Sequence, residues 1–313
     1  MTESASGKIS VTEPVSEAIE KTIIFLFKPF NIGKWFVLGF AAWLMSLAQG
    51  GGFNFNFGGN NAGNLANCAN QFAEFCRIHT VLVAFLIGVF AVLFLTLFVV
   101  CLWLSSRGYF IFVDCLAKNN AEIKRPWNNL KIQANSLFKF RLALAAAAAA
   151  GVLAIFVPVS FVVVALKGSA LGVFAILGLI FATFALVCWL IALSLAAIFM
   201  KDFIIPIMYI RRCKIIAAWQ EFFSMIRGNL WRFFCYILFK IVIAFCVSTI
   251  AALAICLSCC SCCLWIIFVI PYISTVAMLP LISFGRLYPL CYLRQYGPEL
   301  DVFSAVAVQD KPN

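Results

Sequence analysis

The chain has 313 residues, of which 65% are hydrophobic and only 11% are charged, and its net charge is +11 at pH 7. Soluble globular proteins are about 45–50% apolar and about 25% charged, so this composition excludes a soluble domain. The mean hydropathy of +1.05 instead indicates an integral membrane protein. Because apolar runs of transmembrane length recur along the chain, the sequence predicts an all-α fold.

Residues 1–33 form a predicted cytoplasmic segment that contains an interfacial helix. Apolar side chains recur there at helical spacing, at Val15, Ala18, Ile19, Ile23 and Leu26. Charged side chains take the other side, at Glu13, Glu17, Glu20 and Lys21. An amphipathic helix of this kind is expected to lie along the membrane surface, and Pro29 then turns the chain toward the first span.

Six apolar stretches follow within residues 34–284, the predicted membrane domain. A transmembrane helix needs about 20 mostly apolar residues, and the candidates cover residues 34–48, 80–104, 142–166, 170–200, 230–257 and 264–284. The first is short, because glycines begin at Gly50, and it must include neighbouring residues to cross. The fourth is longer than a bilayer requires and is expected to tilt. Residues 285–313 are the predicted cytoplasmic tail.

The distribution of basic residues predicts the orientation. Nearly all of the 23 Lys and Arg residues lie in residues 1–34, 105–141, 201–232 and the tail after residue 284. Because loops rich in Lys and Arg stay on the cytoplasmic side, both termini and both basic loops are predicted to be cytoplasmic, in a multi-pass protein of the cell membrane. This bias explains the net charge without nucleic acid. It also predicts contact with anionic lipid headgroups at the cytoplasmic face.

The stretch from Gln49 to Asn64, QGGGFNFNFGGNNAGN, connects the first two spans on the predicted outer side. It is not a phosphate-binding loop of the Walker type, because no Lys with Ser or Thr follows its glycines. The alternating Phe and Asn residues predict either an extended strip at the outer interface or a flexible loop. The same connector holds Cys68 and Cys76, which are candidates for a disulfide if the outer compartment is oxidising.

Three similar segments each precede a pair of spans and predict an internal repeat. They read NIGKWF from Asn31, NSLFKFR from Asn135 and NLWRF from Asn229. The pairs also close similarly, with RGYFIF from Arg107, KDFIIP from Lys201 and RLYPL from Arg286. A general preference of aromatic and basic residues for the inner interface explains the residue types but not their order. We therefore expect three two-span repeats, each preceded by a cytoplasmic interfacial helix, with Trp127 and Trp219 as anchors of the second and third such helices.

Segments near both ends and in the middle of the chain resemble a known family. They read FKPFNIGKW from Phe27, FIIPIMY from Phe203 with Ala218 and Trp219, and YPLCYLRQYGP from Tyr288. In these segments the chain resembles a family of uncharacterised polytopic membrane proteins of bacteria and archaea, related to the membrane domain of glycerophosphodiester phosphodiesterases. The resemblance implies a helical membrane fold over most of the chain. It does not imply the phosphodiesterase activity, because the separate soluble catalytic domain has no counterpart in this sequence.

Motifs for catalysis or for a cofactor are not found, so we expect a protein that is not an enzyme. His79 is the only histidine, and no Asp or Glu lies within a predicted span; neither a zinc protease nor a carboxylate-based intramembrane hydrolase is supported. Lys240 lies about 12 Å into the fifth span at 1.5 Å per residue, where a charge is costly and usually functional. Because no span offers an acidic partner, we expect its amine to snorkel to the cytoplasmic interface. A functional intramembrane charge is the alternative.

Cysteines cluster between the fifth and sixth spans, at Cys256, Cys259, Cys260, Cys262 and Cys263. Thiol pairs spaced C-x-x-C can bind a soft metal or exchange disulfides. The cluster lies at a predicted outer turn, however, and cysteine also packs as a small apolar residue. Packing or simple disulfides are therefore favoured over a metal site.

These observations favour a non-enzymatic membrane component that organises or assists a lipid or a partner, which is either another membrane protein or a second copy of the chain. A transporter or channel for a small or lipid-like solute is the alternative. A transporter of polar solutes is expected to carry several charges or broken helices near the midplane. The sequence offers only Lys240, Pro158, Pro271 and Pro280 there.

Overall fold

The structure, a computed structural model, describes residues 10–49, 78–165, 172–260 and 270–304. Within these ranges every regular element is a helix, which confirms the all-α prediction for the described chain. The glycine-rich stretch from Gly50 onward, with its two cysteines, lies outside them.

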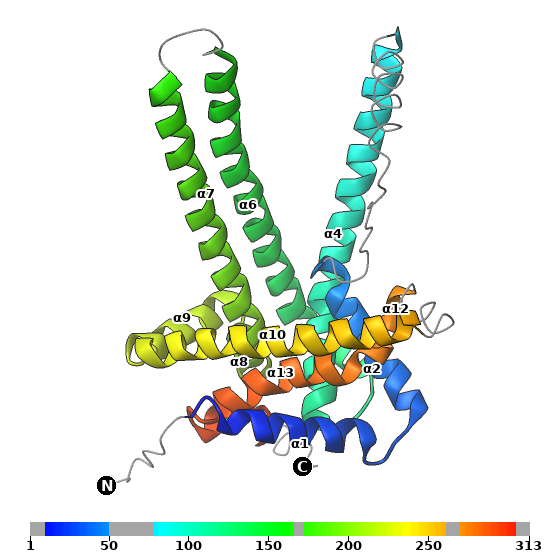
Figure 1. The fold of residues 1–313 in the computed structure, drawn as a ribbon. Coiled ribbons are helices and arrows are strands. Elements are labelled where there is room, and N and C mark those ends of the chain that lie inside the picture. The colour runs from blue at the N-terminus through cyan, green and yellow to red at the C-terminus, as the bar shows by residue number, and fades with distance from the viewer. Residues whose placement is uncertain (1–9, 50–77, 166–171, 261–269, 305–313) are drawn as a thin grey trace.

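Three long helices, α4 (Thr80–Lys118), α6 (Lys131–Ala165) and α7 (Gly172–Phe199), rise from one end of the molecule (Figure 1). α6 and α7 lie side by side, whereas α4 leans away from them toward its N-terminal end. Their upper parts expose large aromatic side chains; Phe94 and Phe181, for example, are 73% and 74% exposed. Exposed apolar surface of this extent is typical of helices that face lipid.

The remaining helices form a base below the three long ones (Figure 1). α1 (Glu13–Phe27) packs against α13 (Leu279–Arg294), and α2 (Ile32–Ser46) packs against the lower half of α4. α9 (Ile215–Arg227) packs beside the lower end of α6. Short 3-10 turns, η1 (Leu47–Gln49) and η3 (Pro298–Leu300), follow α2 and α13.

The buried core lies in this base and is built mainly from three segments. Residues 108–116 of α4, 200–209 after α7 and 287–293 of α13 are almost entirely buried. Each segment coincides with one of the motifs RGYFIF, KDFIIP and RLYPL. The three closing motifs therefore meet in one core, although the threefold repeat itself stays a prediction.

The chain turns into the core after α7 through a π-helical turn, η2 (Met200–Ile204), which leads into α8 (Ile205–Arg211). Pro206 explains the wider turn, because it has no N–H to bond to the carbonyl of Asp202 four residues earlier. The N–H of Ile205 instead donates to the carbonyl of Met200, five residues earlier. Such turns are frequent at functional sites, and this one carries two charged residues of the site described below.

The segment NIGKWF forms the corner between α1 and α2. The side chain of Asn31 caps α2 by accepting a hydrogen bond from the N–H of Lys34 at 3.2 Å. The Lys34 amine and the Trp35 indole then donate to the carbonyls of Phe25 and Leu26, at 2.8 and 2.9 Å. Because the last carbonyls of a helix have no partners within it, these bonds stabilise the end of α1.

The two other Asn-led segments do not form the same corner. Asn229 directly precedes α10 (Leu230–Cys260), and its carbonyl accepts the N–H groups of Arg232 and Phe233. Asn135, in contrast, lies inside α6, which already begins at Lys131. The second Asn-led segment therefore lies within a helix rather than before one.

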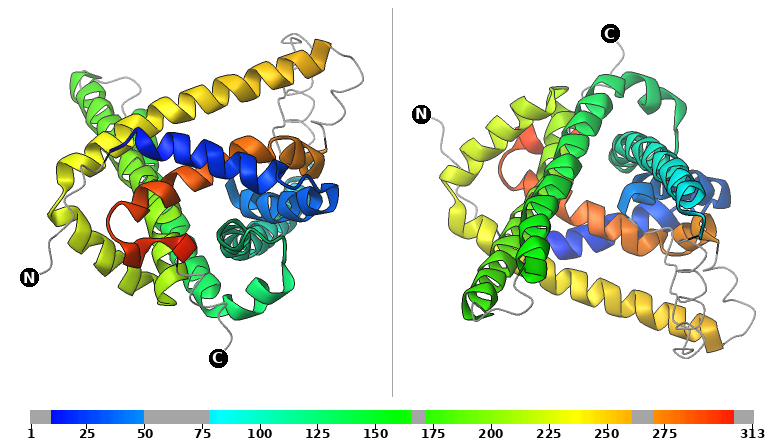
Figure 2. Two further views of the ribbon diagram at one scale, coloured as in Figure 1. Left: turned by 90° about the horizontal axis from the view of Figure 1, so that it is seen from below. Right: turned by 90° about the horizontal axis from the view of Figure 1, so that it is seen from above.

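α10 runs across the base rather than alongside the three long helices (Figures 1 and 2). None of its most apolar stretch is buried within the described chain. α12 (Pro271–Ala277) packs on α2, and a bend of 64° separates it from α13. Pro280 accounts for the bend, because it has no N–H for the carbonyl of Val276.

The structure supports fewer spans than the six predicted. Within the described ranges, four helices are long and apolar enough to cross a membrane, at Thr80–Lys118, Lys131–Pro158, Leu177–Arg211 and Leu230–Ser258. They correspond to the stretches predicted at 80–104, 142–166, 170–200 and 230–257. The bent pair of α12 and α13 makes a fifth if it counts as one span, so the described part of the stretch 264–284 is broken.

The first predicted span, residues 34–48, is too short. It corresponds to α2, which has 15 residues. At 1.5 Å per residue that length covers about 22 Å, less than the roughly 30 Å of the hydrocarbon layer. α2 instead packs against α4 and contributes Leu38, Ala41 and Ala42 to the core.

Helices occur at the three places where interfacial helices are predicted, as α1, as α9 and as the six residues of α5 (Lys124–Asn129). Their location at a membrane surface stays a prediction. On α1, Ala18 and Leu26 are buried completely, whereas Ile19 and Ile23 are 47% and 44% exposed. About half of the predicted apolar face of α1 thus packs inside the protein, and the other half is accessible.

The two tryptophans expected to anchor these helices have aromatic partners in the protein. Trp127 contacts Trp103, with ring centres 6.0 Å apart, and Trp219 stacks on Phe223 at 5.3 Å. A role of either residue at a membrane surface stays a prediction.

Candidate functional site: a buried cationic cluster

Lys240 of α10 forms an ion pair with Asp202 of η2. The Lys240 amine donates to Oδ2 of Asp202, and the Tyr236 hydroxyl donates to the same oxygen at 3.1 Å. The Asp202 side chain is 2% exposed and the Lys240 side chain is 26% exposed. Because a buried carboxylate without partners is very unfavourable, these contacts hold η2 and α10 together.

The expectation that Lys240 has no acidic partner is wrong. The sequence does not identify Asp202 as this partner, because Asp202 lies just beyond the fourth predicted span, in a stretch predicted to be a cytoplasmic loop. The π-helical turn keeps this stretch in the folded core and places Asp202 against α10, 38 residues later in the chain. The amine is therefore bound within the protein rather than directed to the membrane surface.

A second buried carboxylate is held in the same way. Asp114 of α4 accepts a hydrogen bond from the Tyr209 hydroxyl of α8 at 2.8 Å, and its Oδ1 lies 3.1 Å from the Lys118 amine. The Asp114 side chain is 6% exposed. Each carboxylate thus has a lysine and a tyrosine as partners, and the tyrosine comes from a different helix, so both contacts fix how the helices of the base pack.

Arg141 joins α6 to α4. Its side chain is 7% exposed, and its Nη1 donates to the hydroxyls of Ser105 at 3.0 Å and Ser106 at 3.2 Å. Ser105 in turn donates to the carbonyl of Met45 in α2 at 2.7 Å. Both acceptors of the guanidinium are neutral, so these bonds orient Arg141 without cancelling its charge.

Tyr109 of α4 lies between two guanidinium groups. Its ring centre is 5.3 Å from Cζ of Arg141 and 4.9 Å from Cζ of Arg286, close enough for cation–π attraction. Lys201 of η2 interacts electrostatically with both guanidinium groups and with Asp202. We refer to these residues as the cationic cluster: Arg141, Lys201, Lys240, Arg286, Asp202, Tyr109 and Tyr236.

The cationic cluster contains four basic side chains and one carboxylate. It is therefore positively charged, and it lies at the lower ends of α4, α6 and α7, where they enter the base. Charges interact more strongly in a poorly hydrated region than in water, so the cluster is suited to bind an anion.

A pocket of about 420 Å³ opens between α4, α6 and α7 beside two of these cations. Arg141 and Lys201 line it at the end nearest the base. Most of its other lining residues are apolar, among them Leu102, Leu144 and Leu190, one from each of the three helices. The pocket therefore combines positive charge at one end with a hydrocarbon-like wall.

The predicted cysteine sites lie largely at the limits of the described chain. Cys256 is exposed on α10, and Cys259 and Cys260 end that helix. Four cysteines lie outside the described residues: Cys68, Cys76, Cys262 and Cys263. Among the residues that the structure describes, no three His, Cys, Asp or Glu side chains are grouped to hold a metal ion. The disulfide, packing and metal interpretations stay predictions.

Sequence reasoning found parts of the cationic cluster but did not group them. Lys201 and Arg286 begin two of the closing motifs, Tyr109 lies in the third, and Arg141 ends the segment NSLFKFR. Their recurrence was the available signal. This recurrence predicts an internal repeat, but no local pattern reveals that these positions converge.

The described chain is all-helical and has four apolar helices, or five with the bent pair, that are long enough to cross a bilayer, which is compatible with a helical membrane protein. Residues 9–293 match the family model of DUF7544, a family of unknown function, and the chain belongs to that family. No curated protein and no solved structure matches it. These comparisons show no link to glycerophosphodiester phosphodiesterases, so that part of the resemblance stays a prediction.

Proposed function

We propose that this protein is a non-enzymatic component of the cell membrane that organises lipid around its long helices and presents its base to the cytoplasm. The proposal is carried by the division between an upper part that exposes apolar side chains and a base that buries the core together with the charged residues of the cationic cluster. In the upper part, Phe90, Phe156 and Phe184 are 68%, 68% and 66% exposed. Side chains of this kind on helices of spanning length are in a favourable environment only in lipid.

Basic residues on the outside of the base support contact with anionic headgroups. Lys124, Arg125 and Lys131 are all exposed on α5 and at the start of α6. Each such residue near an anionic surface contributes about 1 kcal/mol to membrane attraction. This arrangement fits a cytoplasmic orientation of the base and of both termini.

The internal bonding of the acidic residues supports a role other than catalysis. Asp114 and Asp202 are each bonded to a lysine and a tyrosine of the protein itself. A catalytic carboxylate must lie within hydrogen-bond reach of the substrate. Both groups are instead engaged in contacts that fix the helices, which suits a structural or assisting protein with a membrane partner or a second copy of the chain.

The test is purification in polymer-bounded membrane discs, followed by mass spectrometry of the lipids and proteins that remain bound. We expect lipids to be retained in a composition enriched in anionic species relative to the surrounding membrane. A retained composition equal to that of the bulk membrane, with no partner protein, would contradict the proposal.

A transporter or channel is the second candidate, and the ion pair of Lys240 with Asp202 is the observation that favours it, because paired charges near spans often belong to ion pathways. Purified protein in lipid vesicles distinguishes the two. Flux of a small solute that is abolished by Lys240→Met in a well-folded protein would favour the transporter.

A further inference from the structure

We infer that the pocket between α4, α6 and α7 binds the phosphate group of an anionic lipid, with Arg141 and Lys201 at the phosphate and the apolar walls along an acyl chain. This inference rests on the proposed lipid-organising function and names the ligand class and the site. It is drawn from three features of the pocket: the donors at its lower end, the charge of the cationic cluster, and the apolar lining.

The guanidinium of Arg141 is held in a fixed orientation that suits phosphate binding. The hydrogen bonds to Ser105 and Ser106 both come from Nη1, and a guanidinium carries three further N–H donors on Nε and Nη2. Guanidinium groups bind phosphate through two parallel hydrogen bonds. The serines fix the plane of the group before a ligand arrives, so little side-chain freedom is lost on binding.

The charge of the cationic cluster favours an anion in the pocket. Asp202 already accepts from Lys240 and Tyr236, and the positive charges of Arg141, Lys201 and Arg286 act on one another. Repulsion among three cations in a poorly hydrated region is relieved by a bound anion. A phosphate diester, with one negative charge and two free oxygens, suits a site with two donors.

The lining above the cations distinguishes a lipid from free phosphate. Ala145 and Ala148 of α6 face the pocket opposite Leu190 and Leu193 of α7. The small side chains leave the space, and the leucines supply apolar surface. An acyl chain can make van der Waals contacts along these walls, whereas inorganic phosphate gains nothing from them.

The experiment measures binding of three probes to purified protein in detergent by native mass spectrometry: phosphatidylglycerol, phosphatidylcholine and inorganic phosphate. Two variants alter the pocket, Lys201→Gln by removing a charge and Ala148→Leu by filling the space. Two matched controls lie on α6 outside the pocket lining, where Lys139 and Ala150 are both exposed. Lys139→Gln makes the same charge change, and Ala150→Leu makes the same change in size.

We expect phosphatidylglycerol to bind about tenfold more tightly than phosphatidylcholine, and each pocket variant to weaken it by about tenfold while the controls leave it unchanged. Equal loss in Lys139→Gln and Lys201→Gln would overturn the site but leave a general lipid-organising function intact. Inorganic phosphate binding as tightly as phosphatidylglycerol would overturn the lipid assignment. Ala148→Leu also tests the site without altering any charge, so a folding defect in one charge variant does not prevent a decision.

Discussion

Lys240 donates a hydrogen bond to the carboxylate of Asp202, 38 residues earlier in the chain. The contact crosses from α10 to η2 and is shared by Tyr236, which reaches the same oxygen at 3.1 Å. In the sequence Lys240 stands among apolar residues, whereas in the structure its amine lies against polar side chains in the base.

The ion pair between Lys240 and Asp202 predicts that removing the lysine alone destabilises the protein more than removing both charges. Lys240→Met should lower the free energy of unfolding by about 3–5 kcal/mol, because it leaves the buried Asp202 carboxylate without its cation. The double variant Asp202→Asn with Lys240→Met should recover most of that loss. Thermal unfolding in detergent, followed by size-exclusion chromatography, measures both. Lys139→Met, on an exposed site, is the control, and a Lys240→Met protein as stable as the control would show that the amine is not needed by Asp202.

A side chain at Gly108 is expected to clash with the backbone of α2, where α4 packs closely against it. A Cβ atom at Gly108 would lie 2.8 Å from the carbonyl carbon of Leu44, closer than real contacts allow. Gly108→Ala should therefore destabilise the protein by about 1–3 kcal/mol. Gly88→Ala is the matched control on the same helix, because a Cβ atom there has nothing within 4 Å. Equal melting temperatures for the two variants would mean that α2 and α4 are not packed as described.

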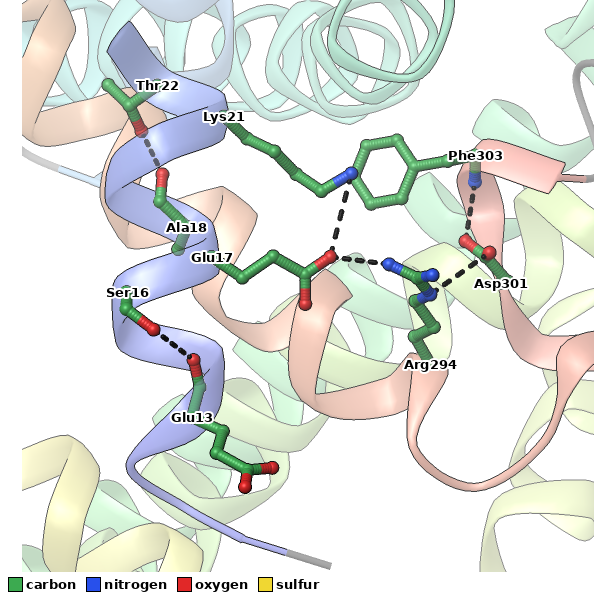
Figure 3. Close-up of polar contacts among 9 residues, drawn as sticks. All are labelled: Glu13, Ser16, Glu17, Ala18, Lys21, Thr22, Arg294, Asp301 and Phe303. Atoms are coloured by element: carbon green, nitrogen blue, oxygen red, sulfur yellow. Dashed lines mark hydrogen bonds and ion pairs between the residues drawn. The ribbon is translucent and has the colours of Figure 1, made fainter. Parts of the chain in front are cut away.

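The ion pairs of Arg294 are expected to protect the segment after α13 from proteolysis. Its guanidinium lies 2.6 Å from Glu17 on α1 and 3.3 Å from Asp301, and Glu17 also faces Lys21 (Figure 3). Arg294 is 48% exposed, and exposed pairs contribute about 0–1 kcal/mol each. Arg294→Gln should thus change global stability little, but it should speed proteolysis after α13, and more so at low salt where the native pairs are strongest.

The control for this variant is Arg125→Gln, which removes a single exposed pair with Glu122. It should leave proteolysis after α13 unchanged. If both variants are cut at the wild-type rate, the network around Glu17 does not hold the segment.

Reporter fusions test the orientation and the course of α10. Fusions after Asn120, Lys214 and Asn313 should report the cytoplasm, and fusions after Asn64, Ser169 and Cys260 the outer side. The decisive position is Cys260, at the end of α10. The apolar sequence of α10 predicts that this helix crosses the bilayer, whereas in the structure α10 lies across the base (Figure 1). An outer signal after Cys260 would support the crossing, and a cytoplasmic signal would support the arrangement in Figure 1.

Much of the helical framework could be predicted from local sequence. The predicted stretches at 80–104 and 230–257 begin at the first residues of α4 and α10, because an uninterrupted apolar run has one stable secondary structure in lipid. The ends were less predictable. α4 continues to Lys118, well past its apolar run, since its lower half is stabilised by packing against α2 rather than by lipid.

The contacts of the candidate site could not be predicted from local sequence. The type and position of Lys240 make it a candidate, but its partner Asp202 lies outside the predicted spans, so the apolar stretches alone do not reveal the pair. Asp202 lies in a turn whose geometry depends on Pro206, and the consequence of that turn for α10 is not encoded within either segment alone.

The helical content and the positions of the longest helices follow from the amino-acid sequence, because hydropathy and composition act locally and do not depend on neighbours far along the chain. Only the packing of the helices brings the three closing motifs into one core, pairs Asp202 with Lys240, and places Arg141 and Lys201 at one pocket. These relationships depend on how helices pack over long separations in sequence, where small differences in turns and side-chain volumes select one arrangement among many of similar local energy.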